Sequence, residues 1–169
     1  MISKDDFASY VHTFVHEFYE ANPTRELLHT FIGAGEEEMS AVQVTWSNRE
    51  EQLEVLKGLH AKYKALGIQM YAYIGEGWCS VSSIGTGVAP SESEDRREIV
   101  TVLVHAKENG KPIMTGRGYF LKRNSNNHIT LETMPGDMAG SRISMLLWDN
   151  PQWERMPLLG VGDGDILKP

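Results

Sequence analysis

Two side chains in the middle of this chain could act together as a general acid and a general base. Glu76 belongs to the segment Glu76-Gly77-Trp78, and His105 lies near the end of the β-branched run Ile99 to Ala106. A carboxylate and an imidazole can transfer protons at neutral pH when they converge within about 3 Å of a reacting atom or of a bridging water. Such a pair would suit a small hydrolase or an isomerase-like enzyme.

The same region could instead form a binding surface. If the strand that ends near Ser82 pairs symmetrically with the next strand, Glu76 lies beside Leu103 and Trp78 beside Thr101 on one face of the sheet. An aromatic wall, a few polar groups and a floor opened by glycines can hold a small ligand or a peptide. In a simpler interpretation, the tryptophan only covers strand glycines and the polar side chains face solvent. The binding residues expected on this face are Glu76, Trp78, Thr101, His105, Gly116 and Gly118.

A β-hairpin must position these residues, and the dipeptide Asn109-Gly110 predicts its turn. The two-residue turn sets the register of the strands on either side. We expect His105 to face Met114, Leu103 to face Gly116, Thr101 to face Gly118 and Ile99 to face Phe120. The opposite face, which should pack against helices, is expected to carry Tyr73, Val81, Val100, Val102, Val104, Ile113, Tyr119 and Leu121.

Hydrophobic residues at the helical period predict two long helices. The first spans Ser3 to Glu20, and Ser3 with Asp6 resembles a capping box. The second spans Ser47 to Leu66, with Ser47 and Glu50 as its capping pair and Gly67 as its stop.

Shorter elements are predicted around these helices. A short helix is expected over Thr24 to Ile32, ended by Gly33, and a short strand over Met39 to Thr45. Extended segments are predicted over Ile68 to Ser82, Ile99 to Ala106, Pro112 to Lys122 and His128 to Thr133, with a long loop over Ser83 to Asp95 and a short helix near Ile143 to Leu147.

Composition excludes several functional classes. The 169 residues carry a net charge of -7 at a pI near 5.3, and the basic residues are scattered, which argues against a nucleic-acid or acidic-membrane partner. A single cysteine excludes an internal disulfide. Together with an opening that lacks the pattern of a signal peptide, it indicates a reducing cytoplasm. No apolar run reaches the roughly 18 residues that a membrane span needs.

Three further features are interpreted as structural. His12 and His16 lie four residues apart on the polar side of the first predicted helix, but no third ligand is evident, so a solvated helix face is expected. Cys79 is expected to be buried and inert. The run Asp163-Gly164-Asp165 lacks the liganding glutamate of a calcium loop. We therefore expect no metal and no cofactor.

One sequence pattern resembles a known group of proteins. The residues Glu76-Gly77-Trp78, and then Pro90-Ser91-Glu92-Ser93-Glu94-Asp95-Arg96-Arg97-Glu98 ahead of a hydrophobic strand, are similar to the E-x-W and P-S-x-x-x-D-R-x-E elements of small bacterial and phage proteins of unknown function. The resemblance covers about Leu53 to Arg123. It implies no activity. Physically, Asp95, Arg96 and Glu98 could pair locally and fix the start of the next strand, and Asp95 and Arg96 join the expected binding residues.

The sequence thus predicts one domain over residues 1–169, of the α+β class, with two layers in which N-terminal helices pack on an antiparallel β-meander. Residues 1–66 should be mainly helical with one short strand, 67–134 should form the meander and 135–169 should be irregular. The leading functional hypothesis is a non-enzymatic module that binds a small ligand or a protein and forms a homo-oligomer. The alternative is the hydrolase or isomerase-like enzyme that uses Glu76 and His105.

Overall fold

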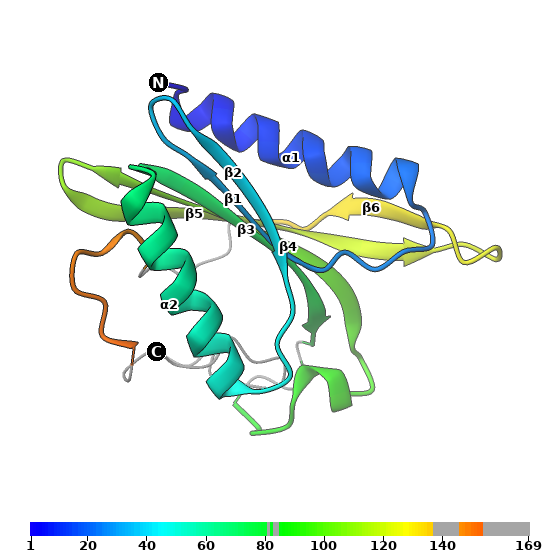
Figure 1. Cartoon of the computed structure of the whole chain (residues 1–169). Coiled ribbons are helices and arrows are strands. Elements are labelled where there is room, and N and C mark those ends of the chain that lie inside the picture. The colour runs from blue at the N-terminus through cyan, green and yellow to red at the C-terminus, as the bar shows by residue number, and fades with distance from the viewer. Residues whose placement is uncertain (81, 83–84, 137–145, 154–169) are drawn as a thin grey trace.

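A six-stranded antiparallel sheet organises the chain in the computed structural model, which describes residues 1–80, 82, 85–136 and 146–153 (Figure 1). The strand order is β2-β1-β3-β4-β5-β6. The strands are β1 (His29–Ala34), β2 (Met39–Val44), β3 (Met70–Cys79), β4 (Arg97–Glu108), β5 (Lys111–Arg123) and β6 (Ile129–Thr133). The helices are α1 (Lys4–Ala21), α2 (Arg49–Ala65) and the short 3-10 turn η1 (Pro90–Glu92). The α+β class and the antiparallel meander are confirmed.

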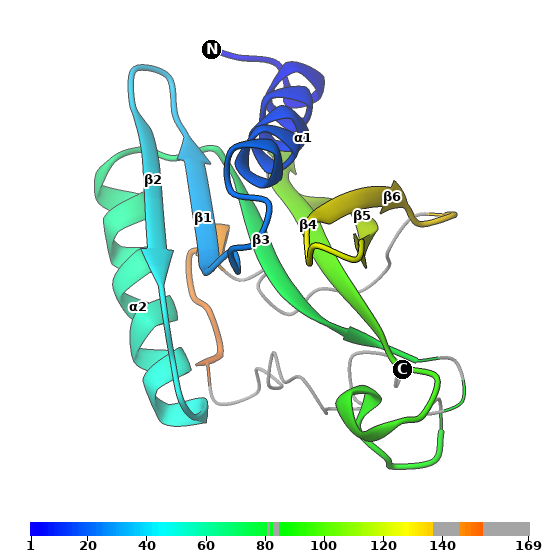
Figure 2. The ribbon, with the colours of Figure 1, turned by 90° about the vertical axis from the view of Figure 1, so that its right-hand side faces the viewer.

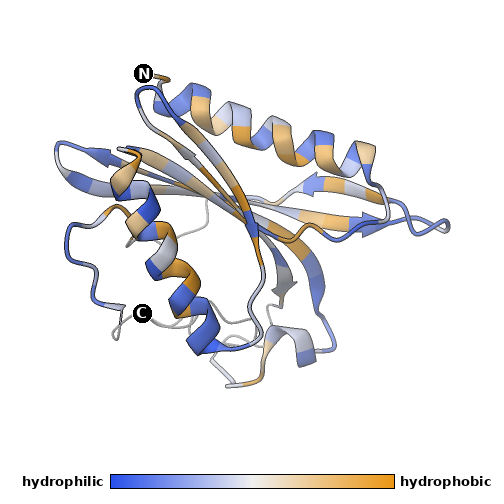
Figure 3. Cartoon of the chain, viewed as in Figure 1, coloured by the Kyte–Doolittle hydropathy of each residue, from blue (hydrophilic) through white to orange (hydrophobic). Residues whose placement is uncertain are grey.

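The β4–β5 hairpin forms with the predicted register. Asn109 and Gly110 both adopt the left-handed backbone, with φ of 51° and 75°, as a two-residue hairpin turn requires. His105 pairs with Met114, and Thr101 pairs with Gly118. Figure 3 shows hydrophilic residues at this tip and hydrophobic residues toward the middle of the sheet. Local turn chemistry is therefore sufficient to align these two strands.

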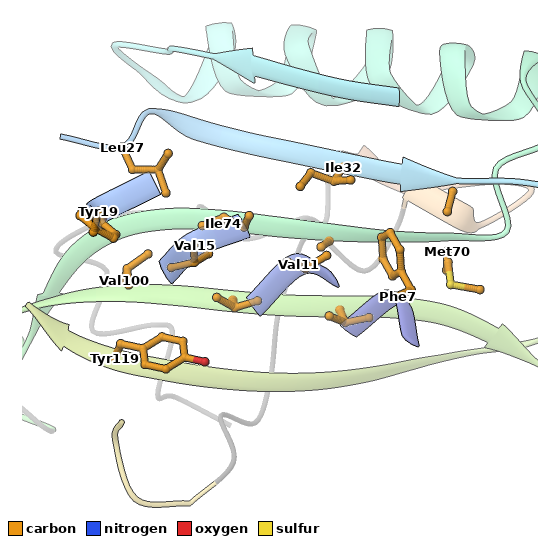
Figure 4. Packing of buried hydrophobic residues seen from close by; sticks show 14 of the residues in the cluster. Phe7, Val11, Val15, Tyr19, Leu27, Ile32, Met70, Ile74, Val100 and Tyr119 are labelled. Atoms are coloured by element: carbon orange, nitrogen blue, oxygen red, sulfur yellow. The ribbon is translucent and has the colours of Figure 1, made fainter. Parts of the chain in front are cut away.

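Helix α1 covers one face of the sheet through a single apolar stripe. Ser3 caps the helix, because its side chain accepts a hydrogen bond from the Asp6 N–H. Phe7, Val11 and Val15 are fully buried against the strands, as Figure 4 shows. Burial of each of these side chains stabilises the fold by roughly 1.5 to 3 kcal/mol.

Helix α2 covers the other face. Its residues Leu56, Leu59 and Tyr63 pack against Phe31 and Tyr71. Side chains alternate along a strand, so neighbouring β3 residues serve different helices. Figure 2 shows the two helices on either side of the strands. The sheet is thus the middle of three layers, whereas the sequence predicted two.

The α2 cap lies one residue later than predicted. Asn48 accepts the N–H of Glu51 at 2.9 Å, and the Glu51 carboxylate accepts the N–H of Ser47 at 2.7 Å. The N-cap is therefore Asn48, and the Glu51 carboxylate accepts the N–H of Ser47, the residue before the cap. The arrangement resembles the predicted capping box of Ser47 and Glu50 without being identical to it.

The short helix predicted over Thr24 to Ile32 is wrong. The chain forms strand β1 there, from His29 to Ala34, between β2 and β3. Its residues from Thr30 to Ala34 are buried, because both faces of this strand are covered. A strand that is buried on both faces has no alternating pattern, so its hydrophobic run is easily mistaken for a helix.

The other predicted strands are present, with ends that differ by a few residues from those predicted. The helix predicted near Ile143 to Leu147 falls largely outside the described residues, as do Val81 and the Asp163-Gly164-Asp165 run. Neither described helix has the length and apolarity needed to cross a membrane.

The glycines of β3 lead to a test of this fold. A Cβ on Gly75 would overlap the Tyr73 hydroxyl, and it would meet the Tyr73 Cζ at 2.7 Å, whereas a Cβ on Gly77 meets no atom within 4 Å. We expect Gly75→Ala to destabilise the protein by about 1 to 3 kcal/mol through overpacking. The matched variant Gly77→Ala should change stability by less than about 0.5 kcal/mol. Urea unfolding of both variants measures the difference, and equal midpoints would contradict this packing.

Candidate functional site

Strands β3 and β4 pair in a register that differs from the predicted one. Glu76 lies opposite Val100 and Trp78 lies opposite Glu98, where the sequence predicted Leu103 and Thr101. The partner of Glu76 thus moves from position 103 to position 100, a shift of three residues. An odd shift turns the side chains of one strand to the other face relative to its neighbour. The two strands therefore do not pair symmetrically about the long β3–β4 connection, and the prediction that they do is wrong.

This register divides the predicted binding residues between the two faces. Glu76 and Trp78 lie on the α1 face, whereas Thr101 and His105 lie on the α2 face with Leu103. Gly116 and Gly118 pair with Leu103 and Thr101 and so share the second face. The sheet separates the Glu76 carboxylate from the His105 imidazole. The predicted acid–base pair is therefore contradicted by the geometry.

His105 is a core residue and not a solvent-facing one. It is 1% exposed, and its ring stacks on Tyr71 with centroids 4.6 Å apart. Neither ring nitrogen has a hydrogen-bond partner in the described part of the chain. Burial lowers the pKa of His105 to about 3, so the ring is neutral at pH 7.

A cavity of about 480 Å³ opens where β1 begins. The pairing of β1 with β3 ends at Thr30 and Ile74, but β3 continues to Cys79 along β4. Beyond Ile74, the described chain therefore leaves an open space beside β3. The lining includes Glu26, His29, Trp46, Glu76, Trp78, Glu98 and Arg123.

The Glu76 carboxylate is the most constrained polar group of the cavity. Its Oε1 accepts a hydrogen bond from the Tyr19 hydroxyl at 2.5 Å and another from the Leu27 N–H at 2.9 Å. Figure 4 shows Tyr19 and Leu27 at the same end of the α1 cluster. No described residue donates to Oε2. Burial raises the pKa of Glu76, while these two hydrogen bonds oppose the rise.

Three other polar groups of the cavity, Glu98, Arg123 and His29, are already engaged. Arg123 donates from Nε to Glu98 at 2.8 Å and from its terminal nitrogen at 3.4 Å, so the two charges neutralise each other. The His29 ring stacks on Trp46 with centroids 4.0 Å apart, and its Nδ1 lies 2.8 Å from the Tyr73 hydroxyl. Burial lowers the pKa of His29, which favours its neutral form.

Trp78 stands beside Glu98 and does not cover Gly118, because the two residues lie on different faces. Its ring is half-buried, and the Arg96 guanidinium lies 5.2 Å from the ring centroid. The simpler interpretation of Trp78 as a cover for these sheet glycines is therefore wrong. The ring instead lines the cavity on the side of Glu76.

Asp95 and Arg96 fix the β3–β4 connection. The Asp95 carboxylate accepts hydrogen bonds from the hydroxyls of Ser80, Ser82 and Ser93, and these hold its pKa well below the usual range. Arg96 donates to the Ser91 carbonyl at 2.7 Å. The predicted local pairing of Asp95, Arg96 and Glu98 with one another is replaced by these contacts. Of the two, only Arg96 approaches the cavity, through the Trp78 ring.

The remaining candidates contribute no site. His12 Nδ1 lies 2.6 Å from the Tyr119 hydroxyl, and His16 packs against the same ring edge-on. Within the described residues, no group of three or more His, Cys, Asp or Glu side chains could hold a metal. Cys79 is half-buried, not buried as expected, and burial raises the pKa of its thiol.

The sequence prediction missed several residues around Glu76, namely Tyr19, Leu27, His29, Trp46 and Arg123. Each of them lies at least 30 positions from Glu76 in the sequence, and His29 and Trp46 also stack on each other. His29 begins β1 and Trp46 follows the end of β2, and the segment that contains His29 was predicted as a helix. In the sequence, only the acidic and aromatic residues of the segment Glu76-Gly77-Trp78 indicated a possible site in this region.

His105 gives a prediction on acid stability. The unfolded chain takes up a proton near pH 6.5, but the folded chain does so only near pH 3, so stability is lost as the pH falls between these values. His105→Phe keeps an aromatic ring on Tyr71 and cannot be protonated. From pH 7.5 to pH 5 we expect the variant to gain about 2 kcal/mol relative to wild type.

Urea unfolding at a series of pH values measures this gain, and the exposed His128→Phe is the matched control. Parallel pH profiles of wild type and His105→Phe would contradict a neutral, unpartnered His105.

Comparison of the chain with family models, with curated proteins and with solved structures finds no match. The resemblance to small bacterial and phage proteins therefore stays a prediction. Any function has to be inferred from the cavity itself.

Proposed function

We propose that this chain is a non-enzymatic binding protein for a small organic ligand, and that the cavity beside Glu76 is the binding site. The observation that carries the proposal is the state of this carboxylate. One oxygen is held by Tyr19 and Leu27, while the other accepts nothing from the described residues. A fixed polar group with one unpaired oxygen, beside aromatic and aliphatic walls, is a common arrangement in ligand sites.

The size and walls of the cavity support this proposal. Ligand pockets commonly measure about 300 to 1,000 Å³, and this one measures about 480 Å³. Trp46 and Trp78 contribute aromatic surface, and Leu27 and Leu121 contribute aliphatic surface. These groups can enclose the carbon skeleton of a ligand while Glu76 sets its orientation.

The engagement of the other polar groups argues against catalysis. A general base or acid needs a second group that can complete the proton transfer. Among the described residues of the cavity, Glu98 is paired with Arg123, and His29 is held by Tyr73 and Trp46. Glu98, Arg123 and His29 are therefore not available as catalytic partners of Glu76, which supports a binding role.

A second candidate function is recognition of an extended peptide. β3 continues past the end of β1, so on one side its last residues have no strand neighbour within the described chain. Such an edge can accept an added strand. Binding that requires a peptide backbone, with no response to small ligands, would favour this second function.

The cellular setting remains as the sequence predicts. We assign the protein to the cytoplasm, without a nucleic-acid or membrane partner, because of its acidic charge of -7 and its single cysteine. The homo-oligomer stays a prediction, and light scattering at several concentrations tests it.

Trp78 separates a binding role from a structural one. Its ring is half-buried, so Trp78→Ala should cost less than the roughly 3 to 5 kcal/mol of a buried tryptophan, and the melting temperature should fall by less than about 10 °C. Binding of fragments found by thermal shift with wild type should be lost. Trp148→Ala, which removes a ring that is 40% exposed elsewhere, is the control and should keep binding.

A fall in melting temperature beyond about 10 °C for Trp78→Ala, with no fragment that binds the wild type, would show that Trp78 serves the fold alone.

A further inference from the structure

We propose that the ligand of this cavity is an organic cation, a primary ammonium or guanidinium group on an apolar or aromatic body. The inference rests on the proposed function, since it names the chemical class that the same site selects. In the bound state, the charged group would donate hydrogen bonds to Oε2 of Glu76. The carbon body would lie against Trp46 and Trp78.

The balance of charge in the cavity favours a cation. Its lining contains the carboxylates of Glu26, Glu76 and Glu98 and the guanidinium of Arg123. Glu98 and Arg123 pair with each other, and burial keeps His29 toward its neutral form. Glu26 makes no ion pair with a described residue. The described lining thus carries three carboxylates against one guanidinium, and this excess of negative charge would repel an anionic ligand.

The hydrogen-bond donors and acceptors around Glu76 also favour a ligand that donates hydrogen bonds. The donors nearest to Glu76, the Tyr19 hydroxyl and the Leu27 N–H, are already used on Oε1. Arg123 directs Nε and one terminal nitrogen to Glu98 and the other terminal nitrogen to Asn127. At Glu76, the group that remains for a ligand is therefore the acceptor Oε2. A ligand that donates fits this arrangement, and a ligand that only accepts finds no partner at Glu76.

The fold has already lowered the hydration of this carboxylate. Glu76 is half-buried, and burial raises its pKa. A partly dehydrated carboxylate loses less water on binding than an exposed one, and its attraction to a cation is less screened. Glu76 is thus prepared for a charged partner before the ligand arrives.

The aromatic walls suit a cation as well. Arg96 already lies over Trp78, 5.2 Å from the ring centroid, so this ring accepts a positive group in the free protein. Trp46 presents the second indole, stacked from one side by His29. Tryptophan is the strongest of the aromatic side chains in attracting cations.

Three compounds of one shape test the charge requirement: 2-phenylethylammonium, 2-phenylethanol and 3-phenylpropanoate. Each is titrated into protein labelled with ¹⁵N, and the indole N–H signals are followed by NMR. We expect the ammonium compound to shift the signals of Trp46 and Trp78 and not those of Trp148 and Trp153, which lie outside the cavity lining. The alcohol should bind more weakly, and the carboxylate should not bind.

Glu76→Gln should weaken binding of the ammonium compound by about tenfold or more, because a charge-assisted hydrogen bond becomes a neutral one. Glu37→Gln, an exposed substitution in the turn between β1 and β2, is the matched control and should bind as wild type. In wild type, affinity should fall as the pH is lowered through the pKa of Glu76. That loss should begin at a higher pH than an ordinary glutamate would give. This pH profile tests the proposal even if Glu76→Gln folds poorly.

The outcomes separate the two proposals. If the alcohol binds as tightly as the ammonium compound, or if the carboxylate binds best, the proposal that the ligand is a cation is wrong. The proposal that the cavity is a binding site is then retained. If no compound moves the Trp46 or Trp78 signal and no fragment binds in the thermal screen, the proposed function itself is overturned.

Discussion

The carboxylate of Glu76 joins three segments that are distant in the sequence. It accepts the Tyr19 hydroxyl from the last turn of α1 and the Leu27 N–H from the chain that enters β1, and it belongs to β3 itself. Removal of either donor would leave a half-buried carboxylate less satisfied, which commonly costs about 1 to 3 kcal/mol. The direction in which the chain leaves the helix, and so the place where β1 starts, depends on this contact. The cavity exists because β1 starts there and β3 continues.

Both faces of the sheet are covered by a helix, and this makes the register of β3 decisive. Ile74 must face α1 and Tyr73 must face α2 for the two cores to be filled. A slip of one residue would exchange these side chains and bury the wrong set on each side. The same alternation carries Glu76 and Trp78 onto the α1 face just beyond the end of that helix. The alternation of side chains that fills the core therefore also places Glu76 and Trp78 in the cavity, beyond the last core residue of β3.

The polar groups of the fold are satisfied by their neighbours to different degrees, and this distinguishes structural groups from the proposed binding group. Asp95 is surrounded by serine hydroxyls and holds the β3–β4 connection. Arg123 and Glu98 neutralise each other. His105 carries unpartnered nitrogens but is sealed in the core. Among these groups, the Glu76 carboxylate combines a fixed position, a free oxygen and access to the cavity, which are the properties that ligand recognition requires.

The sequence by itself determined the elements that depend on local chemistry. Ser3 caps α1, Asn109-Gly110 sets the β4–β5 turn and its register, and hydrophobic periodicity marks both long helices, because these features involve residues close together in the chain. It predicted Glu76 and Trp78, which line the cavity, as binding residues, but it placed His105 on the same face as these two. Only the tertiary structure decided the β3–β4 register, the strand conformation of His29–Ala34 and the partners of Glu76. These three features depend on how segments that are distant in the sequence pack together between the two helices. A pattern within a short stretch of sequence does not contain that information.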